Sequence, residues 1–207
     1  MKFENLKKIP NRLTMFRIFI IIIFIPTVLM DKMISSYIAL FLFIIAAISD
    51  YLDGYIARKY NIISNFGKVM DPLADKIMVI SALLCFIQLN VVPAWMVIII
   101  IAREFLISGI RIMAAKNGDI IAASNWGKAK TITEIIAIIA ILVLLAIVNT
   151  LEYLSISTEK ISILDFQIRF VLLKLIPYWL MFVVAVTALI SGLEYYFKNS
   201  KIFENEI

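Results

Sequence analysis

Asp50-Tyr-Leu-Asp53-Gly54-Tyr-Ile-Ala57-Arg58 is followed, after eight residues, by Gly67-Lys-Val-Met-Asp71-Pro-Leu-Ala-Asp75, and both segments adjoin long apolar runs. An ionised carboxylate at the centre of a transmembrane helix costs roughly 2.5–3.5 kcal/mol. Four such groups would approach the roughly 5–15 kcal/mol that stabilises a whole domain. The four aspartates therefore need a counter-charge, and an all-oxygen ligand set favours a hard divalent cation such as Mg²⁺ or Mn²⁺.

The composition is that of a membrane protein. Of the 207 residues, 63% are hydrophobic, well above the roughly 45–50% of soluble domains, and the mean hydropathy is +0.99. No small-residue cleavage site follows the first apolar run, so we expect it to remain as a membrane span. The chain has no histidine, and Cys85 is its only cysteine. Neither an internal disulfide nor a histidine or thiolate metal site is therefore expected.

The apolar runs predict one all-α domain over residues 1–207, an integral membrane bundle of six transmembrane helices. The expected spans are 12–30, 34–58, 68–89, 94–116, 128–149 and 173–197. Residues 1–10 are basic and amphipathic, which predicts a short N-terminal interfacial helix. The mixed polar and apolar segment 150–172 predicts a loop that contains a second short interfacial helix.

The distribution of Lys and Arg predicts the orientation. Six spans place both termini on one side, and the opposite side holds only Lys32, Lys160, Arg169 and Lys174. The positive-inside rule then puts both termini and the aspartates on the cytoplasmic side of the cell membrane. Cytoplasmic loops beside anionic lipids also account for the net charge of +5 without a nucleic-acid partner. Trp95, Trp126 and Trp179 fall near predicted helix ends, as interfacial anchors do.

The aspartates have the spacing of a metal site. Asp50 and Asp53 are three residues apart on one predicted helix, and Asp71 and Asp75 are four apart on the next. Each pair therefore lies on one helical face. A short turn makes the two helices antiparallel neighbours, so the pairs can meet. Four carboxylates suit two divalent ions about 3.5–4 Å apart, the arrangement used in phosphoryl chemistry.

Small residues and one arginine accompany the aspartates. Gly54, Ala57 and Gly67 would leave space beside the metals for a flat or phosphorylated ligand to approach the backbone. Arg58 offers a planar fork of donors that suits phosphate oxygens.

At these positions the chain resembles the CDP-alcohol phosphotransferases, whose signature is D-x2-D-G-x2-A-R-x8-G-x3-D-x3-D. All eight fixed positions match. The resemblance implies that a hydroxyl of one alcohol displaces CMP from a CDP-linked lipid or alcohol, and that the enzyme is a homodimer. It also implies roles for the eight residues. Asp50, Asp53, Asp71 and Asp75 would hold two metal ions, Asp75 would also be the general base, and Gly54, Ala57, Arg58 and Gly67 would line the CDP site.

Other segments resemble the bacterial phosphatidylglycerophosphate synthases within that family, which implies CDP-diacylglycerol and sn-glycerol 3-phosphate as substrates. The segments are residues 10–17, 103–111, 127–131 and 191–196. A basic acceptor site agrees with this. Arg103 and Arg111 are two helical turns apart and face one way, and Lys128 and Lys130 open the next predicted helix. With Arg17, these residues are predicted to bind the acceptor phosphate.

Alternatives remain open at this stage. Arg111, Lys128 and Lys130 would each also fit as ordinary charges at cytoplasmic helix ends, and Glu104 would fit as a partner of a nearby basic residue. The acceptor could instead be inositol phosphate, serine or phosphatidylglycerol. A cation-coupled transporter is a remote alternative, because intramembrane aspartates also mark ion pathways. No inverted repeat supports it.

Overall fold

A computed structural model of the chain describes the backbone of residues 2–60, 65–116, 124–158 and 163–199. Side chains are described for residues 14–52, 55, 74, 76–114, 124–154 and 167–199. Within these ranges all regular structure is helical. The elements are α1 (Lys2–Leu29), α2 (Met33–Tyr60), α3 (Asn65–Gln88), α4 (Ala94–Lys116), α5 (Asn125–Thr158), α6 (Ile163–Phe170), the π-helical turn η1 (Val171–Leu175) and α7 (Ile176–Lys198). The all-α prediction is confirmed for this part of the chain.

Short turns connect α1 to α2 and α3 to α4. Asp31 and Asn90 adopt positive φ angles of 47° and 56°, in the left-handed region that Asp and Asn tolerate better than most residues. Ser35 then helps to start α2, because its hydroxyl accepts a hydrogen bond from the Lys32 N–H at 3.1 Å. Pro93 directly precedes α4. These turns let neighbouring helices run antiparallel.

The helices form a closed bundle. α1 packs against α2 and α3, α2 against α5, α5 against α7, and α7 against α4, while α4 also contacts α3 and so closes the bundle. Large side chains that are almost completely buried fill the space between them; examples are Phe24, Phe86, Met96, Ile138 and Met181. They belong to one continuous apolar core.

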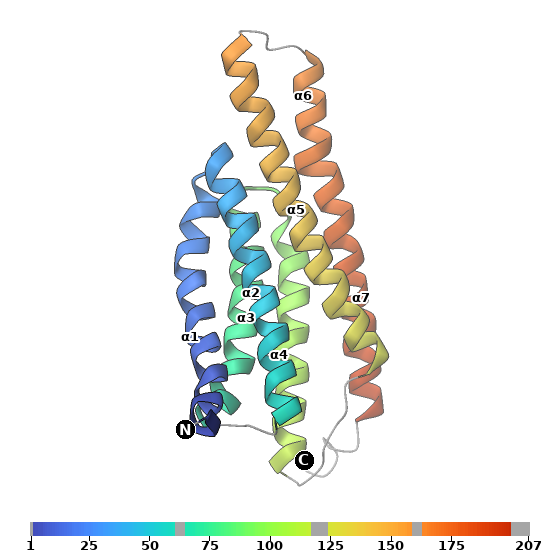
Figure 1. Cartoon of the computed structure of the whole chain (residues 1–207). Helices are drawn as coiled ribbons and strands as arrows, with labels where there is room; N and C mark the ends of the chain where they lie inside the picture. The colour runs from blue at the N-terminus through green and yellow to red at the C-terminus, as the bar shows by residue number, and fades with distance from the viewer. Residues whose placement is uncertain (1, 61–64, 117–123, 159–162, 200–207) are drawn as a thin grey trace.

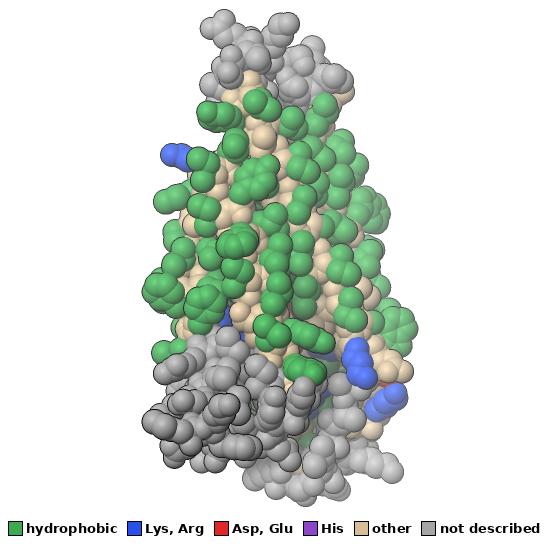
Figure 2. Space-filling view, in the orientation of Figure 1, with side chains coloured by type: hydrophobic (Ala, Val, Ile, Leu, Met, Phe, Trp, Pro, Cys, Tyr) green, Lys and Arg blue, Asp and Glu red, His purple; other side chains and the backbone are tan. Residues whose placement is uncertain are grey.

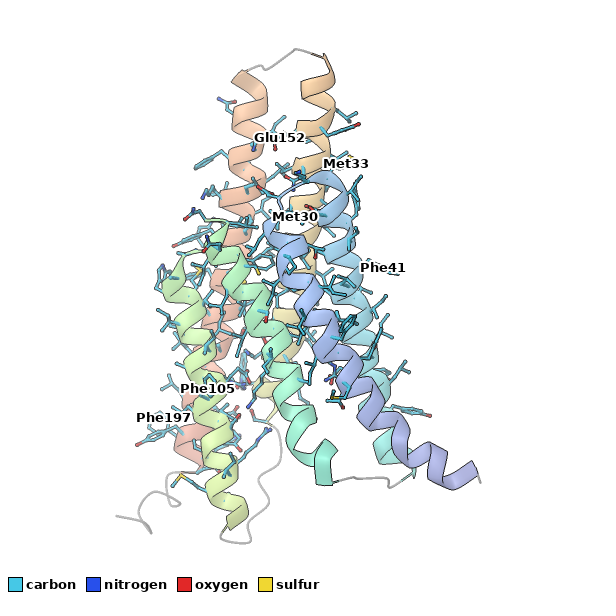
Figure 3. The ribbon with its side chains drawn as sticks, turned by 90° about the vertical axis from the view of Figure 1, so that its left-hand side faces the viewer. Met30, Met33, Phe41, Phe105, Glu152 and Phe197 are labelled. Carbon is cyan, nitrogen blue, oxygen red and sulfur yellow. The ribbon has the colours of Figure 1, made fainter. Side chains whose placement is uncertain are left out.

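The two ends of the bundle are formed by different segments of the chain (Figure 1). The start of α1, the end of α2, the start of α3 and the end of α7 lie together (Figure 1). We call this the signature end. Phe105 and Phe197 lie toward it, whereas Met30, Met33 and Glu152 lie toward the other end, the remote end (Figure 3). Both halves of the aspartate signature therefore belong to the same end of the bundle.

The described surface is that of a membrane protein. Apolar side chains cover most of the face shown in Figure 2. Three segments are long and apolar enough to cross a membrane: Met33–Leu52, Asn125–Leu154 and Gln167–Lys198. Thr14–Leu29 and Lys76–Gln88 are shorter apolar helices. The six predicted spans are helical. Within the described residues, three of the helices, α2, α5 and α7, contain a segment long and apolar enough to cross a membrane.

The predicted loop over 150–172 is wrong for most of its length. α5 continues to Thr158, and α6 passes through η1 into α7. The sequence between Gly127 and Pro177 contains neither glycine nor proline, so neither of the two strongest helix breakers stops α5 at residue 150, where the side chains become polar. α5 and α6 consequently extend beyond the other helices at the remote end (Figure 1).

The N-terminal segment is also continuous with its neighbour. Residues 2–10 are helical and form the first part of α1. Their position at a membrane interface stays a prediction, because their side chains lie outside the described residues.

Candidate functional site

The signature residues lie on two consecutive helices at the signature end. Asp50, Asp53, Gly54, Ala57 and Arg58 are on α2, and Gly67, Asp71 and Asp75 are on α3. Both segments are helical, which agrees with the prediction that each aspartate pair shares a helical face. Of these eight side chains, that of Asp50 is described. Among the described residues no group of three acidic or cysteine side chains could hold a metal. The metal, base and CDP assignments therefore remain predictions.

Arg17 contacts the signature itself. Its Nη1 lies 2.8 Å from Asp50 Oδ1, with Arg17 only 1% exposed and the Asp50 side chain 45% exposed. The sequence assigned Arg17 to the acceptor phosphate, and this partnership between α1 and α2 was not predicted. Because Arg17 is almost fully buried, losing Asp50 would remove a carboxylate partner from a charge that water hardly reaches. The exposed part of the Asp50 carboxylate remains accessible to another cation.

Arg103 is held in a narrow slot between α5 and α7. Its side chain is 10% exposed, and Nη1 lies 2.7 Å from Glu104 Oε1, while Nη2 donates a hydrogen bond of 2.6 Å to Ser191 Oγ. A Cβ atom added at Gly127 would lie 3.4 Å from Nη2, and one added at Gly192 would lie 3.4 Å from Arg103 Cγ. The two glycines therefore leave the room that the guanidinium and its stem occupy.

Lys130 lies at the centre of a buried ion cluster. Its ammonium is completely buried and forms ion pairs with Glu104 and with Glu134, the latter at 2.9 Å. With Arg103, the cluster contains two positive and two negative groups, so it is formally neutral. Burial favours such neutrality, because an unpaired charge is expensive in an apolar interior. The expectation that Glu104 pairs with a basic neighbour is confirmed.

Glu134 was not predicted as part of the site. The available signal was its position four residues after Lys130 on the same helix, where opposite charges meet. Its burial changes the interpretation of Lys130. The Lys130 ammonium already contacts two carboxylates and is closed to solvent, so a phosphate could reach it only by displacing one of them.

Arg111 lies about two helical turns after Arg103, on the same face of α4. Its Nε donates a hydrogen bond of 3.2 Å to the Tyr195 hydroxyl, and its guanidinium carbon is 5.7 Å from the centre of that ring. Arg103 and Arg111 therefore both reach α7, at positions 191 and 195, which confirms that they face one way. Arg111 is exposed while Tyr195 is buried. The arginine head is therefore positioned by a rigid aromatic partner.

The first turn of α5 brings Lys128 to the same end of the bundle. Ser124 precedes this helix, and its hydroxyl accepts a hydrogen bond of 3.0 Å from the Gly127 N–H, as an N-cap residue does. Lys128 is exposed one residue later. Lys128 and Lys130 thus differ: one is open to a ligand and the other is buried.

A polar connection links the ion cluster to α3. Lys76, the residue after Asp75, contacts the Ser108 hydroxyl with its ammonium. Ser108 in turn donates a hydrogen bond of 2.7 Å to the Glu104 carbonyl oxygen. A cavity of about 60 Å³ lies here between α3, α4 and α5, and its polar walls include Lys76, Glu104 and Glu134. The signature helix and the basic cluster therefore form one continuous polar region.

Comparison with known proteins identifies the family. The model of the family described as CDP-alcohol phosphatidyltransferase matches residues 7–158. A protein of Bacillus subtilis (strain 168) is 44% identical over 146 residues, which cover 65% of this chain and 76% of that protein. A protein of Mycoplasma genitalium is 34% identical over 201 residues, covering 89% of this chain and 81% of the relative. A protein of Rickettsia felis is 36% identical over 155 residues, covering 75% and 85%. All three are named CDP-diacylglycerol–glycerol-3-phosphate 3-phosphatidyltransferase.

Proposed function

The chain belongs to the CDP-alcohol phosphatidyltransferase family, and from this premise we propose the reaction named for its relatives. It transfers the phosphatidyl group of CDP-diacylglycerol to the 1-hydroxyl of sn-glycerol 3-phosphate and releases CMP. The observation that carries the proposal is the location of all eight signature residues on α2 and α3 at one end of the bundle. The basic residues of α4 and α5 at the same end support an anionic acceptor.

Two divalent ions, Mg²⁺ or Mn²⁺, would be held by Asp50, Asp53, Asp71 and Asp75. The fit is one of chemistry: the four ligands offer only carboxylate oxygens, and the Asp50 carboxylate is half-exposed at the end of its helix. When bound, the ions would stabilise the charge on the leaving phosphate and acidify the attacking hydroxyl.

The remaining steps belong to the protein's own side chains. Asp75 accepts the proton of the acceptor hydroxyl while the hydroxyl oxygen forms a bond to the phosphatidyl phosphorus. The bond from that phosphorus to the oxygen of CMP breaks at the same centre. Gly54, Ala57 and Gly67 leave space for the CDP group, and Arg58 donates hydrogen bonds to its phosphates. Positioning and charge stabilisation supply most of the rate, as in other phosphoryl transfers.

The five basic residues of the predicted acceptor site divide into two groups. Arg111 and Lys128 are exposed and bind the phosphate of glycerol 3-phosphate directly, whereas Arg103, which is 10% exposed and paired with Glu104, adds its positive charge beside them. Arg17 and Lys130 are buried and paired with carboxylates, which favours supporting roles. Arg17 holds Asp50 in place, and Lys130 holds Glu104 against Arg103.

The proposed topology has six spans, with both termini and the active site at the cytoplasmic face of the cell membrane. The excess of Lys and Arg at the signature end supports it. The diacylglycerol tails stay in the bilayer while the CDP head reaches the aspartates, and the N-terminal part of α1 lies along the interface. The family resemblance also implies that the enzyme is a homodimer.

The test is release of CMP from CDP-diacylglycerol by the purified full-length protein in detergent, with Mg²⁺ or Mn²⁺. Glycerol 3-phosphate, inositol phosphate, serine and phosphatidylglycerol are offered separately. We expect metal-dependent release with glycerol 3-phosphate alone. Asp71→Asn should abolish this activity, whereas Glu152→Gln, which changes an exposed acidic residue at the remote end, should preserve it.

Each outcome bears on the proposal differently. Release with another acceptor alone would refute glycerol 3-phosphate and keep the family chemistry. Absence of release with every acceptor, from protein with an intact helical circular dichroism spectrum, would refute the proposed reaction and favour the transporter alternative.

A further inference from the structure

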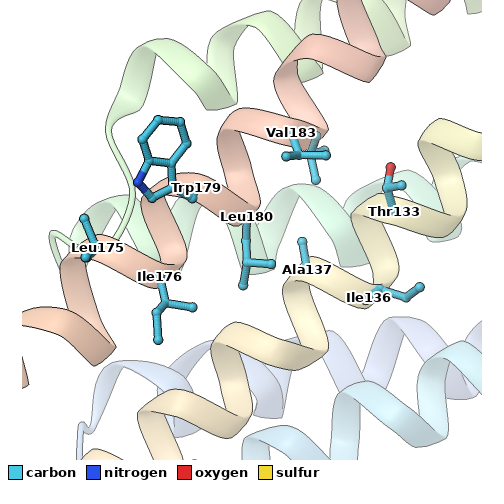
Figure 4. Close-up of a pocket in the computed structure, with 9 residues that line it drawn as sticks. Thr133, Ile136, Ala137, Leu175, Ile176, Trp179, Leu180 and Val183 are labelled. Atoms are coloured by element: carbon cyan, nitrogen blue, oxygen red, sulfur yellow. The ribbon is translucent and has the colours of Figure 1, made fainter. Parts of the chain in front are cut away.

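An apolar groove of about 510 Å³ runs between α5 and α7. It is lined by Thr133, Ile136, Ala137, Leu175, Ile176, Trp179, Leu180, Val183 and Val184. Leu180 and Ala137 point toward each other between the two helices (Figure 4). Ile136, Trp179 and Val183 are more than half exposed, so the groove opens to the outside of the bundle. Both helices that form it are long and apolar enough to cross a membrane.

The length of the groove matches one leaflet. From Leu175 to Val184 α7 advances by nine residues, or about 13–14 Å at the α-helical rise. The hydrocarbon core of a bilayer is about 30 Å thick. Measured from the level of the α3–α4 turn, which Lys174 contacts, the groove therefore spans nearly half of that thickness, as one lipid acyl chain does.

A second cavity of about 410 Å³ continues from the remote end of the groove, and Leu175 lines both. Its other walls include Lys174, Tyr178 and the turn between α3 and α4. The Lys174 ammonium donates a hydrogen bond to the Asn90 carbonyl oxygen. In the described part of the chain no carboxylate forms an ion pair with Lys174. Lys174 is exposed, so its ammonium is accessible to an anion from another molecule.

The depth of Lys174 agrees with the lipid headgroups. It lies level with the α3–α4 turn, where the chain reverses at the remote end. Just below it, Tyr178 and Trp179 pack edge to face with their ring centres 5.7 Å apart, and Tyr178 stacks on Phe182. Such aromatic groups are enriched at membrane interfaces. Lys174 also belongs to the π-helical turn η1, a conformation that is frequent at functional sites.

We propose that this composite site binds one anionic phospholipid from the leaflet at the remote end. One acyl chain lies between α5 and α7, and the lipid phosphate contacts Lys174 and the Tyr178 hydroxyl. The site is distinct from that of CDP-diacylglycerol, because it lies at the end of the bundle away from the aspartate signature. It depends on α5 and α7 crossing the bilayer and not on the identity of the acceptor alcohol.

Trp179 offers a direct reporter, because bromine atoms on a lipid chain quench tryptophan fluorescence at short range. The chain has three tryptophans, so Trp95→Phe and Trp126→Phe leave Trp179 as the only one. The full-length protein is reconstituted with increasing fractions of phosphatidylglycerol or phosphatidylcholine brominated in the acyl chains. One lysine near a membrane surface favours anionic lipid about fivefold. We expect half-maximal quenching at an about fivefold lower fraction of the brominated phosphatidylglycerol.

Three variants separate the headgroup from the groove. Lys174→Gln should remove the preference, while Lys174→Arg, which keeps the charge, should retain it. Val183→Phe partly fills the groove and should reduce quenching by both lipids. Val186→Phe makes the same change on α7 outside the groove lining and should not.

Three results would overturn the proposal. The first is equal quenching by the two lipids in the protein with Trp179 alone. The second is a preference that survives Lys174→Gln. The third is quenching that disappears as the protein-to-lipid ratio rises, since this would show that a second copy of the chain occupies the groove.

Discussion

Replacing Lys130 by methionine should destabilise the protein strongly. The Lys130 ammonium is completely buried between Glu104 and Glu134. Without it, Glu104 keeps Arg103 at 2.7 Å, but Glu134, which is 4% exposed, loses its ion pair. Removing one partner of a buried pair costs about 3–5 kcal/mol. Replacing both partners by apolar residues is often neutral or stabilising, so Lys130→Met/Glu134→Leu should recover most of the loss.

The measurement is equilibrium unfolding in mixed dodecyl maltoside and SDS micelles, followed by circular dichroism. Lys128→Met is the matched control, because it makes the same change two residues away on the exposed side of α5, and its unfolding midpoint should not move. A loss of less than about 1 kcal/mol in Lys130→Met would refute the buried cluster. A double variant as unstable as the single one would refute the charge argument.

Kinetics of the same variants test the supporting role of Lys130. If Lys130 orients Arg103 through Glu104, the KM for glycerol 3-phosphate should rise about tenfold in Lys130→Met and in Lys130→Met/Glu134→Leu. This is the effect expected from the loss of a charge-assisted contact. The KM for CDP-diacylglycerol should change less. If the double variant regains both its stability and the original KM for glycerol 3-phosphate, Lys130 has a structural role only.

Three further predictions concern the reaction and the topology. Asp75→Asn should lower kcat by about 10²–10⁴-fold, the usual contribution of a general base; near-normal CMP release would contradict the assignment. Arg111→Ala should raise the KM for glycerol 3-phosphate by about tenfold or more and that for the lipid less, and equal effects would exclude a phosphate contact. With the buried Cys85 replaced by alanine, Lys32→Cys should react with an impermeant maleimide on intact cells, and Lys198→Cys should react only after permeabilisation. Labelling of both on intact cells would refute the predicted orientation.

The sequence alone was sufficient for the features that depend on neighbouring residues. The helices follow from continuous apolar runs and their ends from short polar turns such as those at Asp31 and Asn90. The aspartate signature could be recognised from sequence because it is defined by fixed residue spacings along two consecutive helices. The common direction of Arg103 and Arg111 follows from helical periodicity alone, and their contacts with Ser191 and Tyr195 confirm it. Local polarity was misleading over residues 150–158 and 163–172, which are helical although polar side chains suggested a loop.

Tertiary structure decided which charges meet. α5 is apolar on almost every side, so its sequence has no polar face that tells which way Lys128 and Lys130 point. Packing of α5 against α2 and α7 turns Lys130 inward, where it meets Glu104 of α4 and Glu134, and leaves Lys128 exposed. Likewise, Arg17 meets Asp50 only because α1 packs on α2. A charge in an apolar helix must find a partner, and which partner it finds depends on the neighbouring helix rather than on its own sequence.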